Sequence, residues 1–366
     1  MRIAVIIDTW FPFIGGGQIN AFEISKRIAE KNIIIDIITR NNGKDNLKLP
    51  KNLKVYKLGP KVAVDDPISK IVYIVRSFFF VYRRNYDLVH AHAFLPGITV
   101  RLLMITKKIP AVLTIHGTSI GTNLNNIFMR WLEKFILTQI RYSAQITVSQ
   151  DFLNIKNINQ KVIYIPNGVD VNRFDRIRIQ KVKDPTIIFV GRLHPQKNLK
   201  TLLQAIELAR KKIPDIRLLI VGEGPQREEI IKYVRDLYLN KTVKLLGIVS
   251  GLDLVRLYKS SHLFILPSIY EGQPLTLLEA WAAKLPVITT KTGDCQYLIK
   301  DGSNGYLINN PYNISEITNI CKKALKNKNL TKLGQNGYNL VKENFSWEKS
   351  AQETLSLYEN LAKPKN

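Results

Sequence analysis

The stretch TIIFVGR, residues 186–192, decides the fold, because with it a series of strand-like runs begins for the second time in the chain. In the first half, short β-rich runs alternate with longer helical patterns, from RIAVIIDTW at residues 2–10 to KVIYIPNG at residues 161–168. The second series continues to GYLIN at residues 305–309. Alternation of this kind is typical of βαβ units and of a mainly parallel sheet. The sequence therefore predicts an α/β protein with two Rossmann-like domains.

The chain has 366 residues, which is longer than one hydrophobic core usually supports. Between the two series, NRFDRIRIQKVKDP at residues 172–185 lacks a clear apolar period, and we interpret it as a linker. We predict an N-terminal Rossmann-like domain over residues 1–171 and a second Rossmann-like domain over residues 172–345. Residues 346–366 have a helical apolar period, and we expect this C-terminal helix to pack back on the first domain.

Residue types that can do chemistry follow several of the predicted strands, in the runs IGGGQ, HAH, HGT, GRLHPQKN, VGEGP and YEGQP. In open α/β sheets, ligands bind outside the carboxyl ends of the strands. We therefore expect the two parallel sheets to face one cleft between the domains, and we expect the active site to lie in that cleft.

Composition and charge exclude several classes of protein. Lys and Arg total 54 against 29 Asp and Glu, and this net charge of +25 favours anionic partners. No basic run exceeds three residues and aromatic residues do not interleave with the cations, so we expect no nucleic-acid partner. Cys295 and Cys321 lack metal-ligand spacing, and no Asp-x-Asp pair is present, so we expect neither a metal nor a cofactor. No apolar stretch reaches the ~20 residues that span a bilayer, and we expect a cytoplasmic protein.

A glycine-rich turn follows the first predicted strand. Gly15, Gly16 and Gly17 precede the helical run QINAFEISKRIAE. Glycines let the backbone approach a phosphate closely, and the start of a helix offers amide groups and a positive dipole end. The spacing is not that of the dinucleotide fingerprint, so a purely structural turn is an equal alternative.

Two cations follow the strand of the opening stretch. Arg192 and Lys197 lie between TIIFVG and a helical run that Asn198 begins. A guanidinium and an ammonium group at the end of a strand can converge on a diphosphate. The alternative is a solvated basic loop, which is common in a chain with so many cations.

Two carboxylates stand eight residues apart in the run YEGQPLTLLEAWAAK. Pro274 suits the first turn of a helix, so Glu271 would precede the helix and Glu279 would lie inside it. Carboxylates at these places can accept hydrogen bonds from sugar and ribose hydroxyls, while the amides of Leu275 and Thr276 face a phosphate. An ordinary acidic residue near a helix start is the alternative.

Taken in order along the chain, these segments resemble glycosyltransferase family 4, a group of retaining enzymes with the GT-B architecture. GRLHPQKN matches the G-R-x-x-x-x-K-N segment of the family, and EGQPLTLLEA matches its E-x(7)-E segment. GGG near the N-terminus, VGEGP, and IPNGVD before the linker agree as well. The chain departs from the family pattern at Gln273-Pro274, where many members carry an aromatic residue and a glycine.

The resemblance implies that residues 1–171 form the acceptor-side domain and that residues 172–345 form the nucleotide-sugar-binding domain. It also implies roles for individual residues. Arg192 and Lys197 would neutralise the diphosphate of a nucleotide-sugar donor, Glu271 would contact the transferred sugar, and His116 in TIHGTS would lie near the anomeric carbon; these four are the candidate catalytic residues. His92 in HAHAF is a candidate on the acceptor side. The implied donor-binding residues, with Glu279 on the ribose, are Gly16, Gly17, Gly222, Gly224, Gly272, Leu275, Thr276 and Glu279.

The implied reaction transfers a sugar from a UDP- or GDP-sugar to a hydroxyl of a glycan, lipid or small molecule, with retention of the anomeric configuration. A nucleotide-sugar-binding protein without turnover is one alternative. An epimerase or hydrolase that uses Glu271 and Glu279 as an acid/base pair is another.

The run ISKIVYIVRSFFFVYRR, residues 68–84, combines apolar residues with Lys70, Arg76, Arg83 and Arg84. Such a segment can lie in the interface of an anionic membrane, which would place the protein peripherally at the inner face of the cell membrane and would suit a lipid-linked acceptor. The alternative is an ordinary helix packed on its sheet. The two interpretations do not exclude each other.

Overall fold

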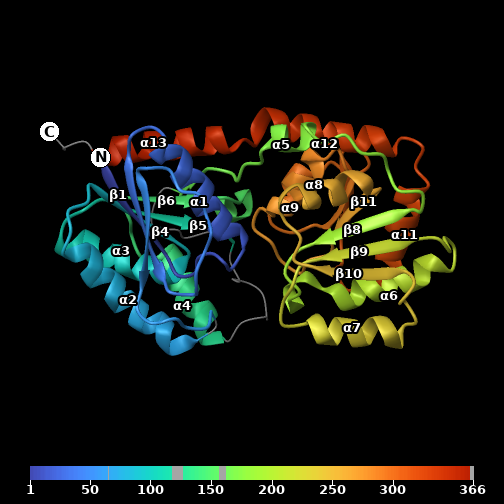
Figure 1. Ribbon diagram of the computed structural model, residues 1–366, viewed down its shortest axis with the longest axis horizontal. Helices are drawn as coiled ribbons and strands as arrows, with labels where there is room; N and C mark the ends of the chain where they lie inside the picture. The colour runs from blue at the N-terminus through green and yellow to red at the C-terminus, as the bar shows by residue number, and fades with distance from the viewer. Residues whose placement is uncertain (65, 118–126, 156–161, 363–366) are drawn as a thin grey trace. The chain divides into compact units, whose positions relative to one another are not determined.

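The computed structural model describes residues 1–64, 66–117, 127–155 and 162–362. The chain divides into two compact units. Unit 1 comprises Met1–Asn167 together with Trp347–Asn366, and unit 2 comprises Gly168–Ser346. Each unit is built around its own parallel sheet, and the colours of Figure 1 follow the chain from one to the other.

In unit 1, the described strands form one parallel sheet in the order β3-β2-β1-β4-β5-β6-β7. The strands are β1 (Arg2–Ile7), β2 (Ile34–Arg40), β3 (Leu53–Leu58), β4 (Leu88–His92), β5 (Ala111–Ile115), β6 (Ala144–Thr147) and β7 (Val162–Tyr164). The helices are α1 (Gly16–Ala29), α2 (Pro67–Tyr82), α3 (Phe94–Thr106), α4 (Ile127–Thr138) and α13 (Trp347–Ala362), with a 3-10 turn η1 (Gln150–Asn154).

In unit 2, the sheet order is β10-β9-β8-β11-β12-β13, again parallel throughout. The strands are β8 (Thr186–Val190), β9 (Arg217–Val221), β10 (Val243–Gly247), β11 (Leu263–Leu266), β12 (Val287–Thr290) and β13 (Gly305–Ile308). The longer helices are α6 (Leu199–Arg210), α7 (Arg227–Asp236), α8 (Gly251–Ser260), α9 (Leu275–Ala282), α11 (Ile314–Leu325) and α12 (Leu330–Asn344). Short elements are α5 (Val171–Asp175), η2 (Pro195–Lys197) and α10 (Cys295–Leu298). Helices cover both faces of this sheet (Figure 1).

The stretch TIIFVGR, residues 186–192, contains β8, which lies between β9 and β11 inside the sheet of unit 2. All five residues of β8 are buried, because parallel sheets are covered by helices on both faces and their strands are apolar throughout. On one face α9 and α12 pack closely at Trp281, whose indole is fully buried and donates to the carbonyl of Asn304 at 3.0 Å. A Cβ on Gly337 of α12 would lie 1.9 Å from Trp281 Cδ1, so only glycine permits this approach.

The stretch that we interpret as a linker, residues 172–185, begins with part of α5. Phe174 in it is 2% exposed, and its ring centroid lies 6.2 Å from that of Tyr258. Ile177 packs against the same core, and the amide of Val182 donates to the carbonyl of Ser260 at 3.0 Å. The stretch is therefore packed onto unit 2, although two apolar residues and a backbone hydrogen bond produce no apolar period in the sequence.

The end of the chain belongs to unit 1. Helix α13 packs against α1, and the side chain of Arg27 donates from Nε to Glu348 Oε1 at 2.9 Å. Tyr358 of the same helix is 1% exposed, and its hydroxyl bonds His90 Nδ1 in the middle of β4. The C-terminal helix thus completes the core of the N-terminal sheet.

Candidate functional site

The two cations predicted from the sequence follow β8 in unit 2. Lys197 ends the short turn η2, which begins where His194 Nδ1 accepts a hydrogen bond from the amide of Gln196 at 3.3 Å. The ammonium group of Lys197 forms an ion pair with the carboxylate of Glu271, and these side chains are 15% and 9% exposed. Two charges that are so far removed from water need each other as partners.

Backbone contacts hold this pair in place. The amide of Ile269 donates to the carbonyl of Gln196 at 2.8 Å, and Gln196 Nε2 donates to the carbonyl of Tyr270 at 2.8 Å. These bonds join the loop after β8 to the loop after β11, which are neighbouring strands in the sheet. Lys197 and Glu271, which are 74 residues apart in sequence, are brought together by this strand order.

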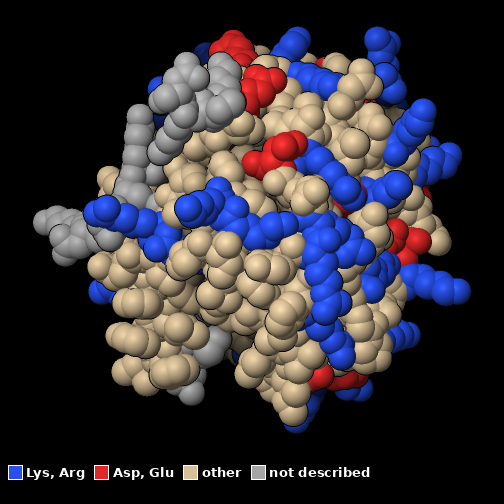
Figure 2. All heavy atoms as spheres, turned by 90° about the vertical axis from the view of Figure 1, so that its left-hand side faces the viewer, with Lys and Arg blue, Asp and Glu red and all other residues tan. Residues whose placement is uncertain are grey.

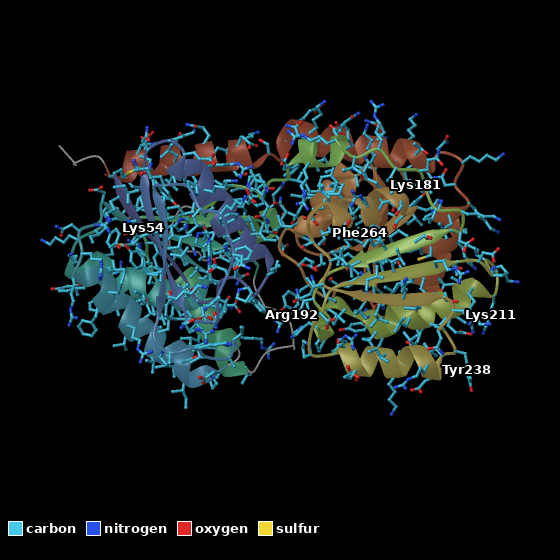
Figure 3. The ribbon with its side chains drawn as sticks, viewed as in Figure 1. Lys54, Lys181, Arg192, Lys211, Tyr238 and Phe264 are labelled. Carbon is cyan, nitrogen blue, oxygen red and sulfur yellow. The ribbon has the colours of Figure 1, made fainter. Side chains whose placement is uncertain are left out.

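Arg192 is exposed and follows β8 by two residues. Figure 3 shows its side chain at the end of the sheet of unit 2 where β8 ends. Unlike Lys197, it is exposed to water.

Gly222 and Gly224 lie in the loop after β9, and both approach the loop after β8. Gly222 has φ +133°, and a Cβ there would lie 2.0 Å from the carbonyl oxygen of Gly191. A Cβ on Gly224 would lie 2.3 Å from the carbonyl oxygen of Leu193, whose amide donates to the carbonyl of Glu223 at 2.9 Å. Contact between two protein backbones is therefore enough to require glycine at both positions.

The start of α9 follows Glu271. Pro274 precedes the helix, and Leu275 and Thr276 are its first residues, whose amides lack the acceptors that residues inside a helix have. The carbonyl of Gly272 accepts from the amide of Asp294 at 2.8 Å. Gln273, at the departure from the family pattern, is buried and donates from Nε2 to Asp294 Oδ2 at 2.8 Å. The unusual residue thus fastens the loop before α9 to the segment after β12.

Glu279 lies on the next turn of α9 and is partly buried. The hydroxyl of Tyr258, in α8, donates to Glu279 Oε2 at 3.0 Å. Burial raises the pKa of Glu279, and this hydrogen bond acts in the opposite direction. Sequence reasoning missed Tyr258, because nothing in the sequence pattern relates residue 258 to residue 279.

In unit 1, the glycine turn lies against a histidine. Gly16 and Gly17 are the first two residues of α1, and a Cβ on Gly17 would lie 3.2 Å from His116 Cδ2. His116 follows β5, the second strand from β1 in the sheet. The structure therefore brings the turn and His116, predicted separately from the sequence, to one place.

His116 belongs to a row of three histidine rings. His92 Nδ1 and His116 Nε2 are 2.9 Å apart, and their rings are stacked at 5.1 Å with an interplanar angle of 13°. The ring of His90 lies 4.4 Å from that of His92, and His90 Nε2 shares a hydrogen bond of 2.7 Å with Thr114. His90 Nδ1 is bonded to the hydroxyl of Tyr358.

The histidine row is neutral at pH 7. Burial lowers the pKa of His90 to about 3 and that of His116 to about 4, and it holds the pKa of His92 well below its ordinary value. His92 is 2% exposed, so it has little surface for direct contact with an acceptor. His116 is partly buried, and its Nδ1 has no hydrogen-bond partner among the described residues.

Within the described residues, no group of three or more His, Cys, Asp or Glu side chains could hold a metal ion. Both cysteines are buried free thiols. Among the helices of these residues, none has both the length and the apolar character to cross a bilayer.

Two α/β units, each with a parallel sheet and with charged or glycine-rich loops at the carboxyl ends of its strands, define a protein of the GT-B architecture. The whole chain superposes on sucrose-phosphate synthase from Thermosynechococcus elongatus with a TM-score of 0.85, at 22% identity and with 98% of each chain covered. It superposes on Anabaena Alr3699/HepE, solved in complex with UDP and glucose, with a TM-score of 0.78 at 17% identity, covering 98% of this chain and 100% of the other.

Two family models match the sequence: Glycosyltransferase Family 4 over residues 14–173, and Glycosyl transferases group 1 over residues 171–340. UDP-Gal:alpha-D-GlcNAc-diphosphoundecaprenol alpha-1,3-galactosyltransferase of Escherichia coli is 25% identical over 95% of this chain and 94% of its own length. The chain belongs to the group 1, family 4 glycosyltransferases, and it is an enzyme of the transferase class. The family and the fold that the sequence motifs predict are confirmed.

Proposed function

We propose that the protein transfers a sugar from a UDP-sugar to an acceptor hydroxyl with retention of the anomeric configuration. The observation that carries this proposal is the pairing of Lys197 with Glu271 beside the start of α9. Lys197, Arg192 and the first amides of α9 offer positive charge for a diphosphate, and Glu271 offers a carboxylate for the hydroxyls of the sugar next to it.

In the proposed reaction, the bond from the anomeric carbon to the diphosphate oxygen breaks as the bond to the acceptor oxygen forms on the same face. The proton of the acceptor hydroxyl passes to the leaving diphosphate oxygen. As the bond to the anomeric carbon breaks, its electron pair stays on the diphosphate oxygen, and negative charge grows there before the proton arrives. Lys197 and Arg192 therefore stabilise the transition state more than the ground state. Because these groups can neutralise the diphosphate, we propose that the reaction needs no bound metal.

We propose further roles for residues within each unit. Glu279 would bind the ribose hydroxyls of the donor, with Tyr258 fixing the direction of its carboxylate. His116 would contact the transferred sugar through Nδ1, since its Nε2 is engaged by His92. The amides of Gly16 and Gly17 begin α1 beside His116, and they would meet the diphosphate.

The relatives support the choice of substrates. The name of the Escherichia coli relative gives UDP-galactose as donor and a sugar-diphosphoundecaprenol as acceptor, and the Anabaena structure contains UDP and glucose. We propose a UDP-hexose as donor and a lipid-linked glycan as acceptor.

The test compares Lys197→Ala with Lys200→Ala, which removes an exposed ammonium group three residues further on. Lys200 is 48% exposed and pairs with the exposed Glu229. Loss of a donor to the developing charge costs about 2.7–4 kcal/mol, so kcat of Lys197→Ala should fall about 100- to 1,000-fold. Donor KM should change much less, and Lys200→Ala should resemble the wild type.

The product identifies the reaction class. The purified protein is incubated with UDP-, GDP- and ADP-sugars, with and without polyprenyl-diphosphate sugars, and the products are analysed by NMR. A glycoside with the anomeric configuration of the donor is expected. Free sugar, isomerised donor, an inverted glycoside or no turnover at all would each contradict the proposal.

A further inference from the structure

Helix α2 has two apolar faces. Tyr73, Ser77 and Val81 face the sheet and are buried, and the hydroxyl of Tyr73 donates to the carbonyl of Ile38 at 2.7 Å. On the other face, Ile68 and Ile71 are 71% and 67% exposed, and Val75 and Phe79 continue the row. One face of α2 therefore packs on the core of unit 1, and the other face has no packing partner among the described residues.

The exposed apolar face continues on two neighbouring helices. Helix α2 packs against α3, and α3 packs against α4. Ile105 of α3 is exposed, as are Phe128, Trp131 and Phe135 of α4. The last three lie on one side of α4, with the rings of Trp131 and Phe135 stacked at 5.6 Å. We call the exposed faces of α2, α3 and α4 together the three-helix surface.

The charge of these helices has one sign. Residues 67–84, 94–108 and 127–141 contain four, three and three Lys and Arg residues, and their only acidic residue is Glu133, which is 6% exposed. Figure 2 looks onto one side of the molecule and shows a broad uncharged area that borders a band of Lys and Arg side chains. Exposed apolar and aromatic side chains with a cationic border match a bilayer interface that carries negative headgroups.

We propose that the three-helix surface docks on the surface of an anionic lipid bilayer. Trp131, Phe135 and Phe79 would enter the headgroup region, and the cations of the same helices would contact anionic headgroups. This deepens the proposed function, because it places the enzyme where a lipid-linked acceptor resides. Docking itself needs neither donor nor acceptor, so it is tested apart from activity.

Trp131 provides a direct probe. The other tryptophans, Trp10, Trp281 and Trp347, are at most 5% exposed, whereas Trp131 is 59% exposed. Vesicles of equal parts phosphatidylglycerol and phosphatidylcholine should shift the tryptophan emission to shorter wavelength at low salt, and lipids brominated on the acyl chain should quench it. Vesicles of phosphatidylcholine alone should have a much smaller effect.

Vesicle sedimentation with variants completes the test. Trp131→Ser combined with Phe135→Ser should lower the partition coefficient at least tenfold, and Lys134→Gln should lower it about fivefold. Tyr238→Ser is the matched control, because Tyr238 is 81% exposed but lies in unit 2, outside the three-helix surface (Figure 3). Equal binding by the control and the Trp131 variant would overturn the proposal. So would absence of binding to anionic vesicles, or a stable dimer in which Trp131 is covered by a second copy.

A separate observation concerns His92. Its Nδ1 lies 2.9 Å from His116 Nε2, and both rings are neutral at pH 7, so one proton occupies the space between the two nitrogens. The ring that carries this proton decides whether His116 Nδ1 is a donor or an acceptor. We infer that His92 is a positioning residue that fixes the tautomer and the orientation of His116, an inference that rests on the proposed role of His116.

His92→Phe keeps a stacked ring but removes the nitrogen, whereas His92→Asn retains a polar atom near the place of Nδ1. His92→Phe should lower kcat at least tenfold with little change in donor KM, and His92→Asn should recover a part of it. The ¹⁵N shifts of His116 should show one tautomer in the wild type and a mixture in His92→Phe. An unchanged His116 spectrum, or equal loss in both variants, would remove the inference. Complete inactivity of the wild-type protein would instead refute the proposed function.

Discussion

The three buried histidines of unit 1 predict how stability depends on pH. His90, His92 and His116 all have pKa values below the ordinary 6.5, because burial disfavours the charged imidazolium. The unfolded chain therefore takes up protons first as the pH falls. The protein should be most stable where the imidazoles are neutral in both states, and it should lose stability below about pH 6.5.

The size of the effect follows from the pKa values. With about 4 for His116 in the folded protein and 6.5 in the unfolded chain, lowering the pH from 8 to 5 costs about 2 kcal/mol. His90, at about 3, adds a loss of similar size over the same range. The total is a large part of the 5–15 kcal/mol by which domains are typically stable.

Urea unfolding, followed by circular dichroism at pH 8, 6 and 5, measures this loss. The matched variant is His116→Gln, which removes one titrating group at a partly buried position. At pH 8 its stability provides the reference, and between pH 8 and 5 its loss should be about 2 kcal/mol smaller than that of the wild type. Equal losses in the two proteins would refute the assignment of a depressed pKa to His116.

Three further predictions concern stability and reactivity. Gly224→Ala should destabilise the protein by about 1–3 kcal/mol in urea unfolding, since the added Cβ would lie 2.3 Å from the carbonyl oxygen of Leu193; a neutral effect would show that the two loops can separate freely. Arg40→Met should lower the free energy of unfolding by about 3–5 kcal/mol in the same assay, because the 2% exposed side chain forms two hydrogen bonds with Asp8, at 2.7 and 3.0 Å. A loss below about 1 kcal/mol would contradict the importance of this pair. Burial raises the pKa of the thiols of Cys295 and Cys321 to about 12. Both thiols should therefore react with a thiol reagent at pH 8 only after denaturant is added, and rapid labelling of the native protein would contradict their burial.

Much of the fold follows from the sequence for a simple physical reason. Strands of a parallel sheet are buried on both faces and are therefore rich in apolar residues. The apolar residues of TIIFVGR predict a strand for this reason, and β8 lies at this place in the sequence. The structure agrees less well with the interpretation of residues 172–185 as a linker. Phe174 and Ile177 pack this stretch onto unit 2, and the amide of Val182 bonds the carbonyl of Ser260. Two apolar residues and a backbone hydrogen bond produce no apolar period that could be recognised.

The partners within the site depend on strand order, which the sequence does not contain. His92 and His116 meet because β4 and β5 are neighbours with their carboxyl ends side by side. Lys197 and Glu271 meet because β8 lies next to β11. The sequence predicts that these residues lie at the ends of strands, but only the three-dimensional structure shows which of them are in contact.

The central claim is that Lys197 and Arg192 hold the diphosphate of the donor, and calorimetric titration with UDP and with uridine tests it most directly. The two ligands share base and ribose, and only UDP carries the diphosphate. The wild type should bind UDP at least tenfold more tightly than uridine, and Lys197→Ala should lose about tenfold in UDP affinity, with its uridine affinity unchanged. Equal binding of UDP and uridine by the wild type, or an equal loss for both ligands in the variant, would contradict the account.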